Sequence, residues 1–298
     1  MKIGLIGTGK MGTPLALNAI DNGHEILAFA RSNEKKSKLN EIGVDSVTSY
    51  ETLCKSLAVP RKIWIMVPSG NAVDEVIVNL LPHLSAGDIL IDAGNSNFND
   101  TLRRSKYLHE QHIHFLDVGT SGGIEGARHG ACLMIGGDER IFTLLEPFFR
   151  DISINGGYGY MGVSGSGHYV KMVHNAIEYG MMQSIGEGFD LLKHSEFKFD
   201  YENISRIWSN GSIIEGLLMR LTNEAFKKDS SLENIEGKVN DSGEGRWAVE
   251  EALRLSAYTP VLSLSLLNRF KSRDNDNFSE KVISALRAEF GGHKIDRK

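Results

Sequence analysis

The sequence predicts an α/β fold in which a doubly wound parallel sheet is followed by an all-α domain. Three observations support this prediction. Short β-branched runs alternate with helical patterns through the first half of the chain, as they do in βαβ units. The first of these runs leads into a glycine-rich turn that opens a helical pattern. After about Gly165 the β-branched runs stop, and the remaining patterns have the helical period.

The expected elements follow in order along the chain. The strand-like runs lie at residues 2–6, 25–29, 62–67, 89–92, 114–118 and 132–135. Amphipathic helices are expected between several of them, at residues 13–22, 72–83, 100–111 and 139–150. The second half contains helical patterns at residues 167–194, 201–210, 213–226, 247–256, 261–273 and 279–290. We therefore expect two domains, residues 1–164 and residues 165–298, the second ending in a C-terminal tail.

Length and composition restrict the class of protein. The chain has 298 residues, 41% of them hydrophobic and 24% charged, which indicates a soluble globular protein. Its formal net charge of −5 argues against general nucleic-acid binding, which needs clustered positive charge. The two cysteines, Cys54 and Cys132, form neither a disulfide framework nor a metal-ligand pattern, which suits a reducing compartment. No apolar run approaches the ~18 residues of a spanning helix, so we expect no binding to a membrane. Together these observations predict a cytoplasmic protein that binds neither membrane nor nucleic acid.

The glycine turn is the first candidate binding site. It reads Gly7-Thr8-Gly9-Lys10-Met11-Gly12, and it lies between a predicted strand and a predicted helix. The first glycine permits a tight turn, the second lets a pyrophosphate approach the backbone, and the third lets the helix pack close to the strand. The helix N-terminus favours the phosphate charge. In this context the motif predicts dinucleotide binding on a Rossmann-like sheet, and not merely a flexible loop.

The end of the second predicted strand indicates which dinucleotide is bound. An NAD site usually has an acidic residue there, which accepts a hydrogen bond from the ribose 2′-hydroxyl. This chain has Ala30 followed by Arg31 and Ser32. A guanidinium and a hydroxyl suit a 2′-phosphate, so we predict NADP in preference to NAD. The alternative is that Arg31 is a solvated loop residue.

Three further turns are expected at the carboxyl ends of strands, where ligands bind in open α/β sheets. The first contains Val67 and Pro68, which we assign to the cofactor. The second contains Asn95, which we assign to both cofactor and substrate. The third is Ser121-Gly122-Gly123, where glycines let a ligand approach the main chain and Ser121 supplies a neutral donor.

The long helical pattern at residues 167–194 carries a polar stripe where an apolar one is usual. Lys171, His174, Asn175 and Glu178 fall at i, i+3, i+4 and i+7, on one face. We expect this face to be buried, and the apolar residues of the other faces to pack the helix into its domain; these are Val170, Met172, Val173, Ile177 and Met181. A lysine that loses hydration favours its neutral form and can act as a general base, while a glutamate in a dry pocket can act as an acid. The alternative is a buried Lys–Glu pair that only holds the helix.

Two other features are weaker candidates. His109, His112 and His114 lie close together in the sequence, but no cysteine or paired carboxylate accompanies them, so we expect a surface cluster and no metal. The glycine-rich segment at residues 237–247 opens a helix. It is either a lid over the substrate or an ordinary interhelical loop.

These residues resemble the decarboxylating 6-phosphogluconate dehydrogenases, within the β-hydroxyacid dehydrogenases. The resemblance covers nearly the whole chain, and its motifs lie at residues 7–12, 92–96, 121–128 and 167–179. The pattern Gly-x-Gly-x-x-x-Lys-x-x-x-Asn belongs to the wider group. His174, Glu178 and Tyr179 single out this member.

The resemblance implies an activity and a role for each motif residue. The activity is oxidation and decarboxylation of 6-phosphogluconate to ribulose 5-phosphate with NADP, in the pentose phosphate pathway. Lys171 would take the proton from the C3 hydroxyl, and Glu178 would protonate C1 of the enediol left after carbon dioxide departs. The carboxylate and hydroxyls would be held by Asn95, Ser121, Gly122, Gly123, His174 and Asn175. Tyr179 and Arg269 would hold the phosphate, and a C-terminal tail with Arg287 and His293 would reach the neighbouring subunit's active site.

The chain also departs from the family pattern. Longer members have a lysine and a threonine in the loop near residue 244, where this chain has Ser242 and Glu244, so the contact between this loop and the phosphate stays open. The chain resembles the short form of the family, which implies a homodimer or a homotetramer. One alternative function is another β-hydroxyacid dehydrogenase, of the 3-hydroxyisobutyrate or tartronate semialdehyde type. A second is a nucleotide sensor without turnover, which the presence of both Lys171 and Glu178 argues against.

Overall fold

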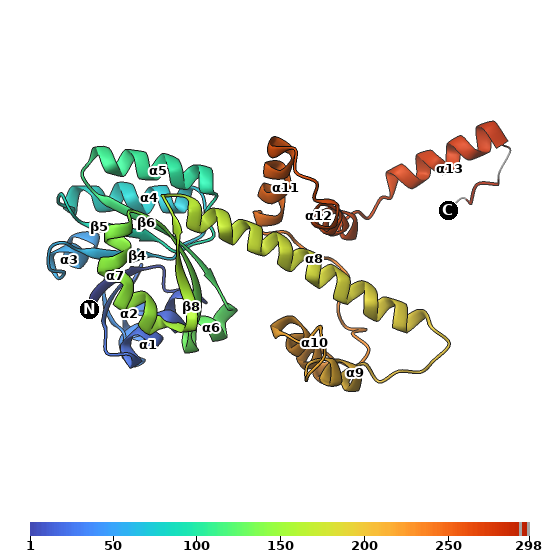
Figure 1. The fold of residues 1–298 in the computed structure, drawn as a ribbon, viewed down its shortest axis with the longest axis horizontal. Helices are drawn as coiled ribbons and strands as arrows, with labels where there is room; N and C mark the ends of the chain where they lie inside the picture. The colour runs from blue at the N-terminus through green and yellow to red at the C-terminus, as the bar shows by residue number, and fades with distance from the viewer. Residues whose placement is uncertain (292–293, 297–298) are drawn as a thin grey trace. The chain divides into compact units, whose positions relative to one another are not determined.

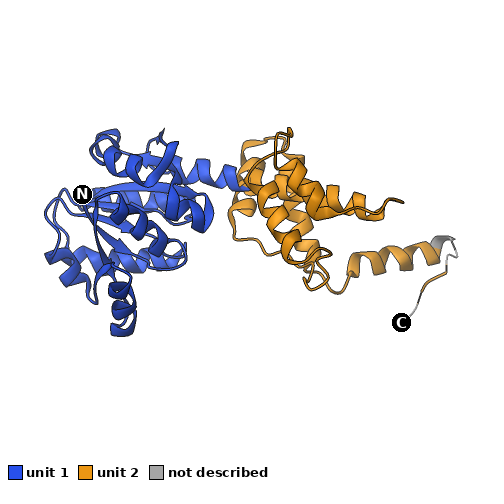
Figure 2. Ribbon diagram, turned by 90° about the horizontal axis from the view of Figure 1, so that it is seen from below, with its two compact units in different colours: residues 1–175 blue, residues 176–298 orange. Residues whose placement is uncertain are grey.

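The computed structural model describes residues 1–291 and 294–296 of the chain. Two compact units can be distinguished, residues 1–175 (unit 1) and residues 176–298 (unit 2), coloured separately in Figure 2. The helix α8 (Ser166–His194) begins in unit 1 and continues into unit 2.

Unit 1 is built on one eight-stranded sheet with the order β3-β2-β1-β4-β5-β6-β7-β8 (Figure 1). Its strands are β1 (Lys2–Ile6), β2 (Glu25–Phe29), β3 (Asp45–Val47), β4 (Lys62–Ile65), β5 (Ile89–Asp92), β6 (His114–Ser121), β7 (Ala131–Gly137) and β8 (Ser153–Gly162). Neighbouring strands pair in parallel except β6 and β7, which are antiparallel. The strand order reverses at β1, which has β2 on one side and β4 on the other, and ligands bind at such a switch point. The predicted α/β fold class is confirmed.

Helices cover both faces of this sheet. They are α1 (Gly12–Asp21), α2 (Asn33–Glu41), α3 (Tyr50–Lys55), α4 (Asn71–Leu80) with the short η1 (Leu81–His83), α5 (Phe98–Glu110), α6 (Gly123–His129) and α7 (Glu139–Ile152). One face packs on α1, α6 and α7 around Phe148, and the other packs on α3, α4 and α5 around Leu108. The alternation along β4 follows from its pleat, because Trp64 lies in the first core while Ile63 and Ile65 lie in the second.

The sequence patterns do not predict five elements of unit 1. The strand β3 has only three residues, and β8 is interrupted by four glycines, so neither shows a β-branched run. The helix α2 has the polar sequence NEKKSKLNE and buries only Leu39, so it lacks an apolar stripe. The helices α3 and α6 are short, with six and seven residues, and α6 follows the left-handed Gly122.

Unit 2 contains helices and no strand among its described residues. After α8 come α9 (Tyr201–Trp208), α10 (Leu217–Lys228), α11 (Glu244–Leu255), α12 (Pro260–Ser272) and α13 (Phe278–Gly291). A small core forms around Phe189, Met219 and Phe226, but many large apolar side chains of this unit are exposed, among them Ile213 and Ile283. No helix in the described part of the chain is long and apolar enough to cross a membrane.

Candidate active site

The glycine turn joins β1 to α1, and its three glycines have different surroundings. Gly7 has a φ of +108°, and a methyl group added there would overlap the Met66 carbonyl oxygen. A methyl group on Gly12 would overlap the Gly7 carbonyl oxygen, whereas one on Gly9 would meet no atom within 4 Å. The packing of the turn therefore requires Gly7 and Gly12, and Gly9 leaves open space beside the turn. This cradle fits the pyrophosphate of a dinucleotide.

A cavity of about 360 Å³ lies beside this turn. Its lining residues are Ile6, Gly7, Thr8, Gly9, Phe29, Arg31, Lys35, Tyr50, Met66, Val67, Pro68 and Val76. The cavity thus brings together three groups that are predicted to bind the cofactor: Gly7, Thr8 and Gly9 of the glycine turn, Arg31, and the pair Val67 and Pro68. Another such residue, Ser32, has a local role, because its hydroxyl accepts the Lys35 N–H and caps α2.

Two aromatic lining residues were not anticipated from the sequence. The rings of Phe29 and Tyr50 stack with centroids 4.3 Å apart and an interplanar angle of 14°. Burial raises the pKa of the Tyr50 hydroxyl, which keeps it neutral. The signal available in the sequence is an aromatic residue at the end of β2, two residues before Arg31, which is predicted to contact the nucleotide. The same cavity is lined by the cations Arg31 and Lys35. The rings suit stacking with an aromatic base, and the two cations suit a phosphate.

The turn that carries Asn95 packs directly on the turn that carries Val67. A methyl group on Gly94 would lie 2.8 Å from the Val67 carbonyl oxygen. The Asp92 carboxylate accepts hydrogen bonds from the Gly94 N–H at 3.2 Å and from the Ser96 hydroxyl at 2.7 Å. Asn95 is exposed between these two buried neighbours. The turn is therefore anchored from within and presents Asn95 at its tip.

Lys171 lies against the backbone of β6. Its side chain is buried, with 6% of the residue exposed, and a methyl group on Gly119 of β6 would overlap its Cβ. The start of α8 is held by the fully buried Asp117, whose carboxylate accepts from the Gly165 N–H at 2.7 Å and the His168 N–H at 2.9 Å. A carboxylate at a helix N-terminus complements the helix dipole. The strand β6 thus sets the position of Lys171 along its surface.

Three predicted substrate residues from β6 and α8 meet in unit 1. The Ser121 Oγ lies 3.2 Å from His174 Nε2, across 53 residues of sequence, and His174 Nδ1 lies 2.9 Å from Asn175 Oδ1. Asn175 is buried. Gly122 and Gly123 have φ values of +107° and +64°, so the backbone turns sharply after Ser121 in a way that side-chain-bearing residues rarely adopt.

The expectation that the apolar residues of α8 pack the helix into its domain is wrong for most of them. Met172 is buried, but Val170, Val173, Ile177 and Met181 are exposed. The polar stripe is therefore the more buried side of the first turns of the helix, and most of these apolar side chains are exposed.

The candidate phosphate residues form a cluster within unit 2. The Arg269 guanidinium carbon lies 3.3 Å from the centroid of the Tyr179 ring, a cation–π contact, and its Nη1 donates to the Asn240 carbonyl at 2.8 Å. The Ser242 N–H donates to the Tyr179 hydroxyl at 3.1 Å. A methyl group on Gly245 would lie 2.5 Å from the Tyr179 ring. The glycine-rich loop that leads into α11 is therefore docked on Tyr179 and Arg269.

Three further predicted site residues are Glu178, Arg287 and His293. Glu178 is half-buried and follows Lys171 by two turns on α8. Arg287 is exposed on α13, and His293 lies outside the described residues. Among the described residues, no group of three or more His, Cys, Asp or Glu side chains is arranged to hold a metal, and this includes the histidines between residues 109 and 114.

Two family models match most of the chain. Residues 2–164 match the model of the NAD binding domain of 6-phosphogluconate dehydrogenase, and residues 167–281 match the model of the 6-phosphogluconate dehydrogenase C-terminal domain. YqeC of Bacillus subtilis (strain 168), which is itself only provisionally assigned as a 6-phosphogluconate dehydrogenase, is 48% identical over 298 residues, the whole of both chains. The NAD(+)-dependent, decarboxylating 6-phosphogluconate dehydrogenase of Haloferax volcanii is 40% identical, with 100% of this chain and 99% of that chain covered.

A solved structure shows the same relationship. The 6-phosphogluconate dehydrogenase of Plasmodium falciparum, solved in its apo form, with its cofactor NADP⁺ and with its substrate 6-phosphogluconate, superposes with a TM-score of 0.84 at 31% identity. The match covers 100% of this chain and 66% of that one. The resemblance drawn from the sequence motifs is thereby confirmed, and the chain belongs to the 6-phosphogluconate dehydrogenase family.

Proposed function

We propose that the chain oxidises and decarboxylates 6-phospho-D-gluconate to D-ribulose 5-phosphate and carbon dioxide with reduction of NADP. The activity would serve the cytoplasmic pentose phosphate pathway and gluconate utilisation. The observation that carries the proposal is the surroundings of Lys171. A buried lysine lies on the β6 backbone, and the same helix and strand supply Ser121, His174 and Asn175. A general base beside hydrogen-bonding groups is what oxidation of a polyhydroxy acid requires.

The cofactor is proposed to be NADP because two cations line the dinucleotide cavity. Arg31 and Lys35 suit a 2′-phosphate, and the lining residues include no carboxylate that would repel it. Family membership does not decide this point, because the Haloferax relative is NAD(+)-dependent and the Plasmodium enzyme was solved with NADP⁺. When bound, the cofactor supplies the hydride acceptor, which is its oxidised nicotinamide ring. The glycine turn, Val67, Pro68 and Asn95 would hold the dinucleotide.

The proposed chemistry uses two side chains of α8. Lys171 accepts the proton of the C3 hydroxyl as hydride leaves C3, giving a ketone β to the carboxylate. The bond between C1 and C2 then breaks and releases carbon dioxide, while the protonated Lys171 donates a hydrogen bond to the C3 oxygen as negative charge develops there. Glu178 protonates the carbon that becomes C1 of ribulose 5-phosphate.

Two groups of residues are proposed to recognise the substrate. The carboxylate and hydroxyls are assigned to Asn95, Ser121, Gly122, Gly123, His174 and Asn175. The phosphate is assigned to Tyr179 and Arg269. These two side chains contact each other and the loop at Ser242, which supports a common role at one end of the substrate.

We further propose a homo-oligomer, a dimer or a tetramer, in which the C-terminal tail with Arg287 and His293 completes the partner's active site. Residues 1–164 would then bind the cofactor, and residues 165–298 would bind substrate and form the subunit interface. The exposed apolar residues of α13 and the exposed apolar face of α8 support this, because faces of this kind are usually covered in oligomers.

The proposal is tested with a panel of substrates and both cofactors. NADP or NAD reduction is followed with 6-phosphogluconate, gluconate and 3-hydroxyisobutyrate, and carbon dioxide is measured in parallel. We expect reduction and carbon dioxide release with 6-phosphogluconate. Turnover of an unphosphorylated hydroxy acid with no reaction of 6-phosphogluconate would instead indicate another β-hydroxyacid dehydrogenase.

A further inference from the structure

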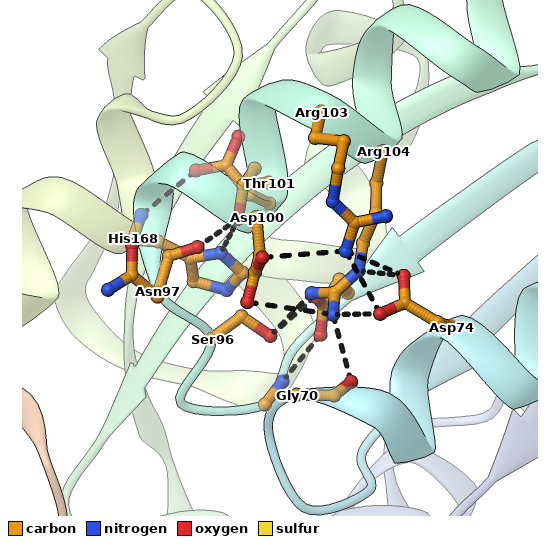
Figure 3. A network of polar contacts seen from close by, with 12 residues as sticks. Gly70, Asp74, Ser96, Asn97, Asp100, Thr101, Arg103, Arg104 and His168 are labelled. Carbon is orange, nitrogen blue, oxygen red and sulfur yellow. Dashed lines mark hydrogen bonds and ion pairs between the residues drawn. The ribbon is translucent and has the colours of Figure 1, made fainter.

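Two adjacent arginines on α5 contact the same carboxylate in very different surroundings (Figure 3). The Arg103 side chain is 57% exposed and contacts Asp74 at 2.9 Å. The Arg104 side chain is 2% exposed, and it binds Asp74 through Nε at 2.9 Å and Nη2 at 3.1 Å. Asp74 lies on α4, so both arginines tie α5 to α4, but only Arg104 continues inward.

The inward contacts of Arg104 reach two strand-end turns. Its Nη2 donates to the Gly70 carbonyl at 2.9 Å, which closes the turn between β4 and α4. Its Nη1 lies 3.4 Å from the hydroxyl of Ser96, in the turn after β5, and 3.6 Å from the carboxylate of Asp92, the last residue of β5. One guanidinium group therefore joins two turns that are separate in the sequence, through donors fixed in one plane.

Both of these turns present candidate ligand-binding groups. The first carries Val67 and Pro68, which line the dinucleotide cavity. The second carries Asn95. Arg104 itself does not line the cavity, so any effect it has on a ligand passes through the turns.

The same helix also contacts the start of α8. One turn before Arg104 on the buried face of α5, the Thr101 hydroxyl lies 2.7 Å from His168 Nδ1, a contact drawn in Figure 3. His168 precedes Lys171 by one turn of α8. The helix α5 thus contacts the β4 turn, the β5 turn and the helix that carries the candidate base.

We propose that Arg104 is a positioning residue that holds the β4 and β5 turns in the geometry that dinucleotide and substrate binding require. Asp92 is fully buried, and the Arg104 guanidinium lies beside its carboxylate. The positive charge of Arg104 therefore compensates the buried negative charge of Asp92 beside the turn that carries Asn95. The expected role in substrate turnover rests on the proposed function, whereas the role in dinucleotide binding does not.

The test compares Arg104→Lys with Arg103→Gln. Lysine keeps the charge beside Asp74 and Asp92 but cannot reach Gly70, Ser96 and Asp74 together. Dinucleotide affinity is measured by fluorescence titration with NADPH and NADH, and kcat and KM are measured with 6-phosphogluconate. For Arg104→Lys we expect affinity and kcat each to fall about tenfold or more, since small displacements of binding groups are costly. For Arg103→Gln both should stay within about twofold of the original chain.

The outcomes separate the alternatives. Unchanged affinity and kcat in a folded Arg104→Lys protein, with only its Tm lowered, would show that Arg104 is merely structural. If Arg104→Lys does not fold, Ser96→Ala decides, because it removes the hydroxyl between Asp92 and Arg104 while leaving the guanidinium in place. Loss of dinucleotide affinity in Ser96→Ala supports the proposal and unchanged affinity overturns it. Should the original chain fail to oxidise 6-phosphogluconate, the titrations still decide the role of Arg104.

Discussion

Lys171 and Gly119 lie so close that no side chain fits between them. A methyl group on Gly119 would overlap the Lys171 Cβ and would lie 3.0 Å from the Gly167 carbonyl oxygen. Carbon atoms in favourable contact are about 3.5–4.0 Å apart. The helix α8 therefore rests on β6 at a distance that depends on glycine, and the candidate base is placed by that contact.

Gly119→Ala is expected to displace Lys171 and lower kcat with 6-phosphogluconate by about 100-fold, because a shift of about 1 Å can cost that much. NADPH affinity should change little, since Gly119 does not line the dinucleotide cavity. The matched control is Gly186→Ala. Gly186 also lies on α8, but a methyl group added there would meet no atom within 4 Å. An undiminished kcat in Gly119→Ala would show that this contact does not position the base.

Glu178→Gln is expected to lower kcat by about 100-fold to 10,000-fold, because the amide cannot donate the proton that C1 requires. Affinity for NADPH should be retained. Glu187→Gln changes an exposed glutamate of the same helix, whose partner in the structure is Gln183, and should leave kcat within about twofold. Equal rates for the two variants would remove Glu178 from the acid role.

Arg31→Ala is expected to weaken NADP binding by about tenfold to 100-fold and NAD binding far less, since a hydrogen bond to a charged group is lost only with NADP. Dissociation constants are obtained by titration with each nucleotide. Lys38→Ala removes a nearby cation that pairs with Glu34 and does not line the cavity, so it should affect the two cofactors equally. Equal losses for both cofactors in Arg31→Ala would place its guanidinium away from the 2′-phosphate.

The buried His24 should make the fold sensitive to acid. Burial, assisted by the Met1 ammonium group at 2.9 Å, holds the pKa of His24 below its usual 6.5, although Asp151 opposes the shift. The folded state therefore binds this proton less readily than the unfolded state does. The contribution of neutral His24 to the stability of the folded state is fully present above pH 6.5. It is lost as the pH falls from 6.5 toward the folded-state pKa of His24.

Thermal unfolding measured between about pH 8 and about pH 5 checks this sign. The Tm of the original chain should fall more steeply below the usual histidine pKa than the Tm of His24→Gln. His129→Gln, at an exposed position, is the control and should keep the original slope. Parallel slopes for His24→Gln and the original chain would contradict the assignment.

Much of the fold could be predicted from the sequence because its core strands are short, strongly β-branched and buried. The strands β1, β2 and β5 have the bounds expected from their patterns. The hydrophobic pattern does not predict an element where few residues are buried, as in α2, or where glycines interrupt a strand, as in β8. Local periodicity cannot report either case, because the neighbouring elements decide whether such a segment is ordered.

The candidate site shows the same division. Some candidate site residues could be identified from the sequence because each belongs to a short local motif. These are the glycine turn, Arg31 and the polar stripe of α8. Arg104 and Tyr50 could not, since their roles depend on contacts between distant segments. The apolar residues of α8 are expected to pack the helix into its domain, and the structure leaves most of them exposed.

The proposed function depends most directly on oxidation and decarboxylation being linked through Lys171. The decisive measurement uses 6-phosphogluconate labelled with carbon-13 at C1, with NADPH followed by absorbance and labelled carbon dioxide by NMR in the same reaction. The original chain should form the two products in equal amounts. Lys171→Met should form neither while still binding NADPH. NADPH formation without labelled carbon dioxide, or undiminished turnover by Lys171→Met, would contradict the proposed role of Lys171.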